Sequence, residues 1–274
     1  MLTLSRGLDG RSLAAVRDLE REVVSHDGGR LKLEHGTLET RDPETVQDVL
    51  WWDGDRLLGF AGIYAFGGVE IAGMVAPQAR RRGIGTALLD AALGIVGRTA
   101  LLVTPTATPA GQSFALARGG TPDHSEHFLV LRETPPPAPA RPGLSTRTAE
   151  REDLETVRDL LRSAFDWEPP TDVLDRPDDS TQVISVDGVP VGTLRVSRRA
   201  DSAGIYGFAV APEHQGKGIG RDVLRQTCRD LRAEGFERVT LEVETRNDNA
   251  LRLYTSTGFV REAGEDYWTV GQKQ

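Results

Sequence analysis

The chain has 274 residues, of which 38% are hydrophobic and 27% charged, and its formal net charge is −8. These values are typical of globular proteins, and the acidic balance argues against a nucleic-acid partner. No stretch is apolar for long enough to cross a membrane, so we expect a cytoplasmic protein without membrane contact. Cys228 is the single cysteine, so an internal disulfide is excluded. We expect Cys228 to be a small core residue of the helix that follows the second glycine-rich segment.

The first half of the chain predicts the element order β-α-β-β-β-α-β-α-β. An apolar stripe from Leu13 to Val23 indicates a helix, and Asp53-Gly54-Asp55 indicates a hairpin turn. Residues 26–43 are polar and predict an irregular segment. His124 and His127 lack further ligands at metal-site spacing, so we expect no metal. The expected strands are 1–5, 46–52, 57–65, 69–75, 100–103 and 127–131, and the expected helices are 9–24, 83–96 and 110–118.

The second half predicts a similar series of elements after a proline-rich stretch at 134–143. That stretch is typical of a semi-rigid spacer, although a proline-rich ligand for another protein is an alternative. Val157-Arg-Asp-Leu160 repeats Val16-Arg-Asp-Leu19, which indicates a duplication. We therefore expect an N-terminal domain at 1–133, a linker at 134–143 and a C-terminal domain at 144–274. The expected strands are 144–148, 182–186, 189–197, 203–210 and 238–243, and the expected helices are 152–165, 219–233 and a segment after Asn247.

A glycine-rich segment occurs once in each half. Val75-Ala-Pro-Gln-Ala-Arg-Arg-Arg-Gly-Ile-Gly85 aligns without a gap with Val210-Ala-Pro-Glu-His-Gln-Gly-Lys-Gly-Ile-Gly220. Each segment links a predicted strand to a predicted helix, whose first N–H groups and dipole favour an anion. Arginines in the first copy and Lys217 in the second add positive charge. Both segments therefore predict phosphate-binding loops, unless they are merely glycine-rich turns.

The spacing [Arg/Gln]-x-x-Gly-x-[Gly/Ala] after Val-x-Pro resembles the acetyl-CoA pyrophosphate loop of the GNAT superfamily of N-acetyltransferases. The run from Asn247 through Tyr254 to Gly258-Phe259 resembles a second element of that superfamily. The tandem arrangement and the run from Arg80 to Thr86 resemble mycothiol synthase and related actinobacterial acetyltransferases. The resemblance implies an α/β (α+β) fold of two tandem GNAT domains, each a mixed, mostly antiparallel twisted sheet flanked by helices.

The resemblance also implies acetyl-CoA as cofactor and a set of residues that bind it. The cofactor arm would pair with the backbone of the strand that ends at Val210. Asn247 would cap a helix and contact the pantetheine arm. The implied cofactor-binding residues are Phe208, Ala209, Val210, Gln215, Gly216, Lys217, Gly218, Ile219, Gly220, Arg221 and Asn247, with Met74, Val75, Arg80, Arg81, Arg82, Gly83, Ile84, Gly85 and Thr86 in the first half.

Acetyl transfer to an amine needs an acid for the leaving thiolate and a base for the attacking amine. By resemblance Tyr254 is the acid. Glu242 and Glu244 are candidate bases, although both could instead be exposed partners of Arg246 or Arg238. Asp201 is a reserve candidate for the base.

The acceptor site is less well defined by the sequence. Trp167 and Tyr206 are candidate substrate contacts, with Glu168 and Asp172 as further guesses in an acidic segment. A glutamate that mycothiol synthase carries before its second loop falls near Gly204 here, so the acceptor is not carried over from that resemblance.

The predicted function is acetyl-CoA-dependent transfer of an acetyl group to a primary amine of a small molecule or peptide. Alternatives are an amino-sugar or antibiotic acceptor, a mycothiol-synthase-like reaction, or a CoA-binding regulatory or scaffold protein. The first half lacks the tyrosine and the Gly-Phe pair, so we expect it to be catalytically silent. We expect a monomer or homodimer.

Overall fold

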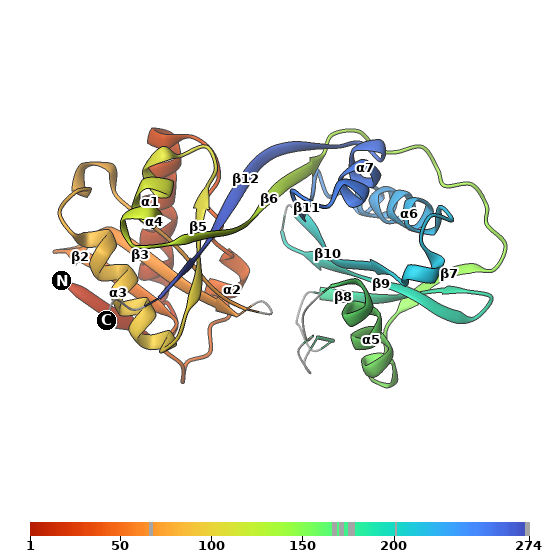
Figure 1. Ribbon diagram of the computed structural model, residues 1–274, viewed down its shortest axis with the longest axis horizontal. Helices are drawn as coiled ribbons and strands as arrows, with labels where there is room; N and C mark the ends of the chain where they lie inside the picture. Colours follow the sequence, from red (N-terminus) through yellow and green to blue (C-terminus); the bar gives the residue numbers. More distant parts are fainter. Residues whose placement is uncertain (66–67, 166–168, 170–172, 175–178, 201, 272–274) are drawn as a thin grey trace. The chain divides into compact units, whose positions relative to one another are not determined.

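The computed structural model describes the chain except for residues 66–67, 166–168, 170–172, 175–178, 201 and 272–274. The chain divides into two compact units (Figure 1). Unit 1 comprises Met1–Glu126 and Ala263–Gln274, and unit 2 comprises His127–Glu262. None of the described helices combines the length and hydrophobicity needed to cross a membrane.

Unit 1 is a sheet with strand order β1-β2-β3-β4-β5-β12-β6, in which β4 and β5 are parallel. The described neighbours β1–β2, β2–β3, β3–β4 and β5–β12 are antiparallel. Its strands are β1 (Leu2–Ser5), β2 (Asp48–Asp53), β3 (Arg56–Ala65), β4 (Val69–Val75) and β5 (Ala100–Pro105), with parts of β6 (Thr121–Leu131) and β12 (Phe259–Val270), and its helices are α1 (Gly10–Asp27), α2 (His35–Glu39), α3 (Ile84–Val96) and α4 (Pro109–Ala117).

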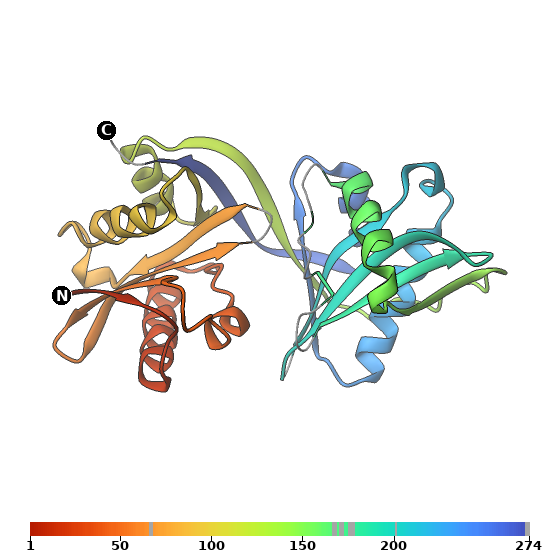
Figure 2. The ribbon, with the colours of Figure 1, turned by 90° about the horizontal axis from the view of Figure 1, so that it is seen from below.

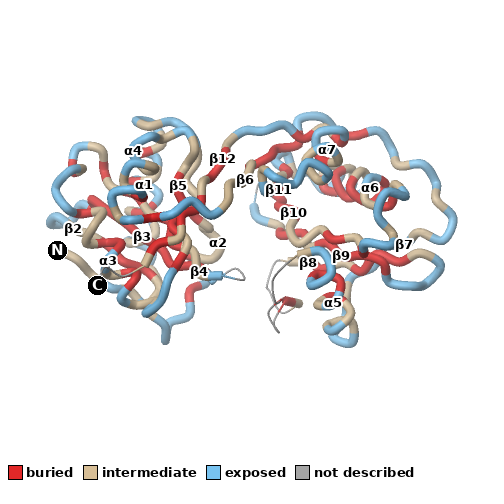
Figure 3. Tube along the Cα trace, viewed as in Figure 1, coloured by how far each residue is buried: buried red, intermediate tan, exposed pale blue. Residues whose placement is uncertain are grey.

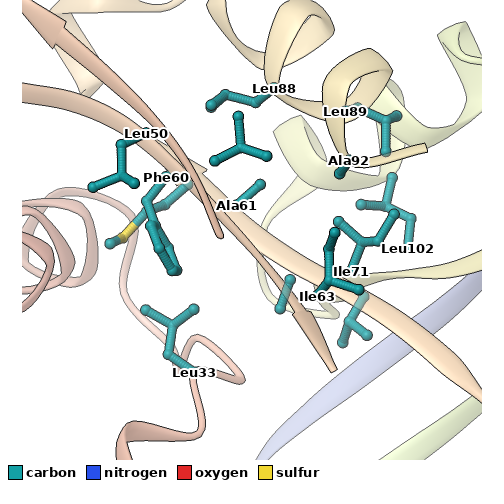
Figure 4. Close-up of a cluster of buried hydrophobic side chains, with 14 of the residues drawn as sticks. Leu33, Leu50, Phe60, Ala61, Ile63, Ile71, Leu88, Leu89, Ala92 and Leu102 are labelled. Carbon is teal, nitrogen blue, oxygen red and sulfur yellow. The ribbon is translucent and has the colours of Figure 1, made fainter. Parts of the chain in front are cut away.

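Helices cover both faces of the unit 1 sheet, with α1 on one face and α3 on the other (Figure 2). Strand alternation sends successive side chains to opposite faces. Phe60 therefore points toward the α1 face, while Ala61 and Ile63 point toward α3, as Figure 4 shows together with Leu88 of α3. Burial of these side chains on both faces makes the sheet the centre of the unit 1 core.

Unit 2 repeats this plan with strand order β12-β6-β11-β10-β9-β8-β7, and β10 and β11 are its parallel pair. Its own strands are β7 (Leu144–Thr148), β8 (Asp179–Val186), β9 (Val189–Arg198), β10 (Ser202–Val210) and β11 (Arg238–Glu244), and its helices are α5 (Leu154–Ala164), α6 (Ile219–Ala233) and α7 (Asp248–Ser256).

The two faces of the unit 2 sheet carry separate apolar clusters. Ile205 and Leu241 belong to the cluster on the α6 face, which also holds Cys228. Val183 and Ala209 pack against α5 on the other face. Figure 3 shows the resulting concentration of buried residues in the strands and in α6.

Strands β6 and β12 each contribute to both units. Residues 121–126 of β6 and 263–270 of β12 belong to unit 1, and the remaining parts of both strands belong to unit 2. The division therefore differs from the expected boundaries at 133 and 144. Local patterns cannot reveal such sharing, because it depends on pairing between strands far apart in the sequence.

Most expected elements are present within a few residues. The helix 219–233 and the strands 69–75 and 144–148 have the expected bounds. Three features were not expected from the sequence: the short helix α2 within the polar segment 26–43, the full length of β6, and β12 as a final strand. Charged and polar residues in β6 and β12 interrupt the alternation of apolar and polar residues by which a strand is predicted from sequence.

Candidate functional site

The loop before α6 has a backbone shape that few side chains permit. Gly216 and Gly218 have φ of 72° and 82°, in the left-handed region that favours glycine. Gln215 donates from Nε2 to the carbonyl oxygen of Val210 at 2.8 Å, which ties the loop to the end of β10. A Cβ on Gly220 would lie 3.6 Å from side-chain atoms of both Phe208 and Leu253, so the glycine lies close to β10 and to α7. The loop thus presents backbone N–H groups at the start of a 15-residue helix, a site that suits phosphate.

The loop before α3 has the same shape. Gly83 matches Gly218 in φ and ψ, and Arg81, with φ of 61°, takes the left-handed position of Gly216. Arg80 replaces Gln215 and donates from Nε to the carbonyl oxygen of Val75 at 3.1 Å. Arg80 also forms a bidentate pair with Asp27 at the end of α1, at 2.9 and 2.5 Å. That pair neutralises part of the positive charge expected at this loop.

Strands β10 and β11 separate next to the loop before α6, which is called the unit 2 loop below; the loop before α3 is the unit 1 loop. They pair only from Ser202–Arg238 to Ile205–Leu241, although β10 continues to Val210. The register of β10 with β9 also shifts between Tyr206 and Ala209, and Gly207 there has a φ of 53°. A bulge of this kind bends the strand and redirects its backbone groups. The arrangement leaves the end of β10 open to pairing with an extended ligand.

Unit 1 has the strand separation without the bulge. Its β4 and β5 pair from Glu70–Leu101 to Ala72–Val103 and then part. Its β3 and β4 stay in continuous register from Gly59–Val75 to Ala65–Val69. The backbone at the end of β4 is therefore not redirected as it is in β10.

Helix α7 lies beside the start of α6, because Leu253 comes within 3.6 Å of the position that a Cβ on Gly220 would occupy. Tyr254 is the next residue of this helix. Asn247 caps the helix by accepting a hydrogen bond from the Ala250 N–H at Oδ1, at 3.0 Å. Tyr254 is 8% exposed and packs edge-on against Phe259, with ring centroids 6.2 Å apart. Burial raises the pKa of Tyr254 to about 12. Its phenol therefore remains protonated at neutral pH, as a general acid must before it donates.

The matching helix of unit 1 carries no phenol at this position. Tyr254 is the seventh residue of α7, and Ala115 is the seventh residue of α4. Thr108, at the N-cap of α4, makes no side-chain capping bond.

The α5 face of the unit 2 sheet holds several polar side chains. Strand alternation places Tyr206 and Glu242 on this face, because their neighbours Ile205 and Leu241 face α6. The Arg195 guanidinium lies 5.2 Å from the Tyr206 ring centroid, and Arg195 Nε is 3.5 Å from Asp179 Oδ2. A cavity of about 80 Å³ opens here, lined by Val157, Leu161, Val173, Thr181, Thr193, Arg195 and Gly207.

The corresponding α1 face of unit 1 holds one buried ion pair and one half-buried cluster of charges. Arg41 pairs in bidentate fashion with Asp48, at 2.8 and 3.2 Å, and both side chains are at most 1% exposed. Lys32 Nζ lies 3.5 Å from Glu70 and 3.4 Å from Glu126 and donates to the Tyr267 hydroxyl. These cations come from the segment expected to be irregular, and they occupy the face where unit 2 has its cavity.

The predicted site residues of unit 2 fall into three groups. Tyr206 and Phe208–Val210 belong to β10, the residues from Gln215 to Arg221 form the loop and first turn of α6 that follow it, and Asn247 and Tyr254 belong to the cap and body of α7. Glu242 is half-buried and Glu244 is exposed, on the same strand face. Trp167, Glu168, Asp172 and Asp201 lie outside the described residues.

Sequence reasoning missed Arg195 and Asp179 as polar groups of the α5 face. A charged residue inside the apolar strand β9 was the available signal for Arg195. Two glycines within β10, at 204 and 207, were a signal for the bulge. Among the described residues, no three His, Cys, Asp or Glu side chains are grouped so as to bind a metal.

Comparison with known proteins agrees with this geometry. The model of the Acetyltransferase (GNAT) family matches residues 13–110 and 147–259, one stretch from each half. The chain is 28% identical to mycothiol acetyltransferase of Nocardia farcinica over 92% of both sequences. It is 29% identical to mycothiol acetyltransferase of Thermobispora bispora over 93% of both.

Two solved structures share the fold across nearly the whole chain. A GCN5-related N-acetyltransferase from Sphaerobacter thermophilus has a TM-score of 0.80 at 17% identity, covering 100% of this chain and 98% of that one. A tandem GNAT protein from the clavulanic acid biosynthesis pathway has a TM-score of 0.74 at 19% identity, covering 100% and 99%.

The fold and the matches define an acetyltransferase with two tandem units. The chain belongs to the GNAT family, and it is an N-acetyltransferase that uses acetyl-CoA. The predicted family, fold class, enzyme class and cofactor are thereby confirmed.

Proposed function

We propose that unit 2 binds acetyl-CoA and catalyses transfer of the acetyl group to a small-molecule primary amine. The observation that carries this proposal is the end of β10, where the bulge, the parted strands and the glycine loop occur together. The diphosphate would bind the N–H groups of residues 216–220. The pantetheine arm would pair with the backbone of Phe208–Val210 and contact Asn247.

In this proposal Tyr254 donates a proton to the sulfur atom that leaves the thioester. Its phenol is protonated at neutral pH, as this role requires, and the raised pKa means that proton donation depends on good geometry with the sulfur atom. The backbone N–H near Val210 would stabilise the oxygen that becomes negative as the amine attacks. Bound acetyl-CoA supplies the activated acetyl group, and the chain supplies orientation and proton transfer.

Glu242 is our candidate for the group that accepts the amine proton, directly or through water. It lies on the α5 face, as do Tyr206 and the cavity. Glu244 is the weaker candidate, because its exposure leaves it in contact with bulk solvent. The acidic segment around Trp167 remains a proposed contact for the acceptor.

We propose that unit 1 is catalytically silent. The absence of a phenol at Ala115, the continuous register of β4 and the ion pairs of Arg41 and Lys32 support this assignment. Arg80, Arg81 and Arg82 could still hold a CoA phosphate, so this unit keeps a proposed cofactor loop without the catalytic group.

Support for one acceptor class comes from the relatives named mycothiol acetyltransferase, whose length the chain matches almost completely. The leading candidate is therefore the amine that becomes mycothiol on acetylation. Amino sugars, antibiotic amines and peptide N-termini are the alternatives. We further propose a cytoplasmic location, in keeping with the single buried cysteine and the absence of any disulfide. For the oligomeric state we propose a monomer or homodimer.

The test is release of free CoA from acetyl-CoA with each amine in turn, including the desacetyl form of mycothiol. A single amine class that raises kcat/KM above the others by at least about a hundredfold, roughly 2.7 kcal/mol, identifies the acceptor. Binding of acetyl-CoA without turnover of any amine would instead favour a CoA-binding regulatory or scaffold protein.

A further inference from the structure

A buried carboxylate lies in the first turn of the helix that follows the unit 2 loop. Asp222 is 5% exposed, and its backbone N–H donates to the carbonyl oxygen of Gly218 at 3.1 Å. A negative charge this close to the start of α6 stabilises the helix by itself. It also opposes a second negative charge, such as a diphosphate, bound at the same helix start.

The proline-rich linker supplies the partner of this carboxylate. Arg141 donates from Nε to Asp222 Oδ2 at 2.8 Å, and its Nη2 lies at the same distance from that oxygen. The same Nη2 is 2.9 Å from the position that a Cβ on Gly218 would occupy. The guanidinium therefore contacts the carboxylate and occupies the space beside Gly218, the residue just before α6.

Further contacts hold the linker along α6. Arg229, two turns further along the helix, donates to the carbonyl oxygen of Pro135 at 3.1 Å. The Leu144 N–H donates to the carbonyl oxygen of Arg141 at 3.2 Å, which fixes the chain just before β7. Arg141 is thus held between two anchored points of the linker.

The unit 1 loop shows what changes when this carboxylate is absent. In the gapless alignment of the two loops, Ala87 stands where unit 2 has Asp222. The first loop also has three arginines at 80–82, where the second has Gln215, Gly216 and Lys217. The second loop therefore has fewer cations and one additional buried anion.

We infer that Arg141 of the linker is a positioning residue of the acetyl-CoA site in unit 2. It offsets the charge of Asp222 and so allows the diphosphate to bind at the start of α6. This inference rests on the proposed function of unit 2. It assigns a role in cofactor binding to the segment 134–143, which lies within unit 2.

The test measures acetyl-CoA binding by calorimetry on the full chain at pH 7.5, with Arg141→Gln, Asp222→Asn and the double variant. Arg141→Gln should raise the Kd of unit 2 for acetyl-CoA about tenfold, because it leaves a buried carboxylate without its cation near the phosphates. Asp222→Asn should bind at least as tightly as the unaltered chain. The double variant should recover to within about threefold of the unaltered Kd, since the opposing charge is then gone.

Two controls separate this inference from the proposed function. Gly216→Asp, at a glycine with φ of 72° and no neighbouring atom within 4 Å of its Cβ position, should abolish the unit 2 site, and if it changes nothing, the proposed function itself is wrong. Arg147→Gln breaks a different arginine–carboxylate pair of unit 2, with Asp153, and should leave the Kd unchanged. Unaltered binding in Arg141→Gln, or a double variant no tighter than Arg141→Gln, would overturn the role of Arg141. Melting temperatures of all variants exclude loss of folding as the cause.

Discussion

Tyr254 carries a buried phenol on α7, and the preceding residue of that helix, Leu253, lies against Gly220 at the start of α6. Removing its hydroxyl as Tyr254→Phe keeps the packing against Phe259 and deletes the proposed acid. We expect kcat to fall by about a hundredfold or more, the usual contribution of a general acid, with little change in the KM for acetyl-CoA. Steady-state kinetics with the best amine checks this.

Tyr64→Phe is the control for that variant, because Tyr64 is a buried tyrosine of unit 1 on the α1 face. It should leave kcat unchanged. If Tyr254→Phe retains full kcat at its optimal pH, Tyr254 is not the acid.

The ion pair of His35 makes the folding stability of unit 1 depend on pH. Its Nε2 lies 2.7 Å from Glu20 Oε2, and the hydrogen bond to Glu20 raises the pKa of His35. A folded-state pKa above the unfolded value adds stability that is complete below about pH 6.5 and is lost as pH rises through the raised pKa. Urea unfolding of the unaltered chain and His35→Gln should differ most at low pH.

The difference between those two proteins should shrink as pH rises toward 8.5. Glu20→Gln should remove the same pH dependence, because the partner of His35 is then neutral. A difference that stays constant from pH 5.5 to 8.5 would contradict the assignment.

At the scale of elements, the cap of α7 links stability to cofactor binding. Asn247→Ala removes the side-chain bond to the Ala250 N–H and should cost about 1 kcal/mol of unfolding free energy. If Asn247 also contacts the pantetheine arm, the same variant should weaken acetyl-CoA binding. Chemical denaturation and calorimetry measure the two effects separately.

Asp9→Ala is the matched control, because Asp9 caps α1 in unit 1 by accepting from the Ser12 N–H at 2.7 Å. It should lose stability by a similar amount and keep the acetyl-CoA Kd. Equal Kd values for the two variants would mean that Asn247 acts only as a helix cap.

The two glycine loops differ in what surrounds them more than in their own shape. Both place a glycine with φ of 82° before a helix, yet only the unit 2 loop follows a bulged strand among the residues described. We expect Gly218→Glu to abolish acetyl-CoA turnover, because its side chain is strained at that φ and brings a negative charge to the phosphate site. Gly83→Glu should leave turnover intact, and its effect on calorimetric stoichiometry reports whether unit 1 binds acetyl-CoA at all.

At the scale of the whole molecule, strands β6 and β12 each contribute residues to both units. A fragment is therefore expected to fold only if it contains the parts of both strands that belong to its unit. A fragment 144–274 would lack Leu129 and Leu131, which are at most 1% exposed in the unit 2 core. Each buried leucine contributes about 1.5–3 kcal/mol, a large part of the 5–15 kcal/mol typical of a domain. We expect this fragment to be unfolded or aggregated.

A fragment 127–262 keeps both strand segments of unit 2 and should fold cooperatively. Circular dichroism during thermal unfolding distinguishes the two fragments. A cooperative transition in 144–274 would show that its core does not need the β6 residues.

The sequence by itself determined the duplication, both glycine loops, the Asn247–Phe259 element and most strand and helix positions. Each of these depends on residues close together in the chain, where spacing and periodicity are direct consequences of helix and strand geometry. Only the tertiary structure decided how β6 and β12 are shared, how Lys32 and Arg41 fill the α1 face of unit 1, and how Arg141 meets Asp222. These contacts join residues far apart in sequence, or residues in segments without periodicity, so which charge meets which depends on the completed packing of the sheet and not on any local pattern.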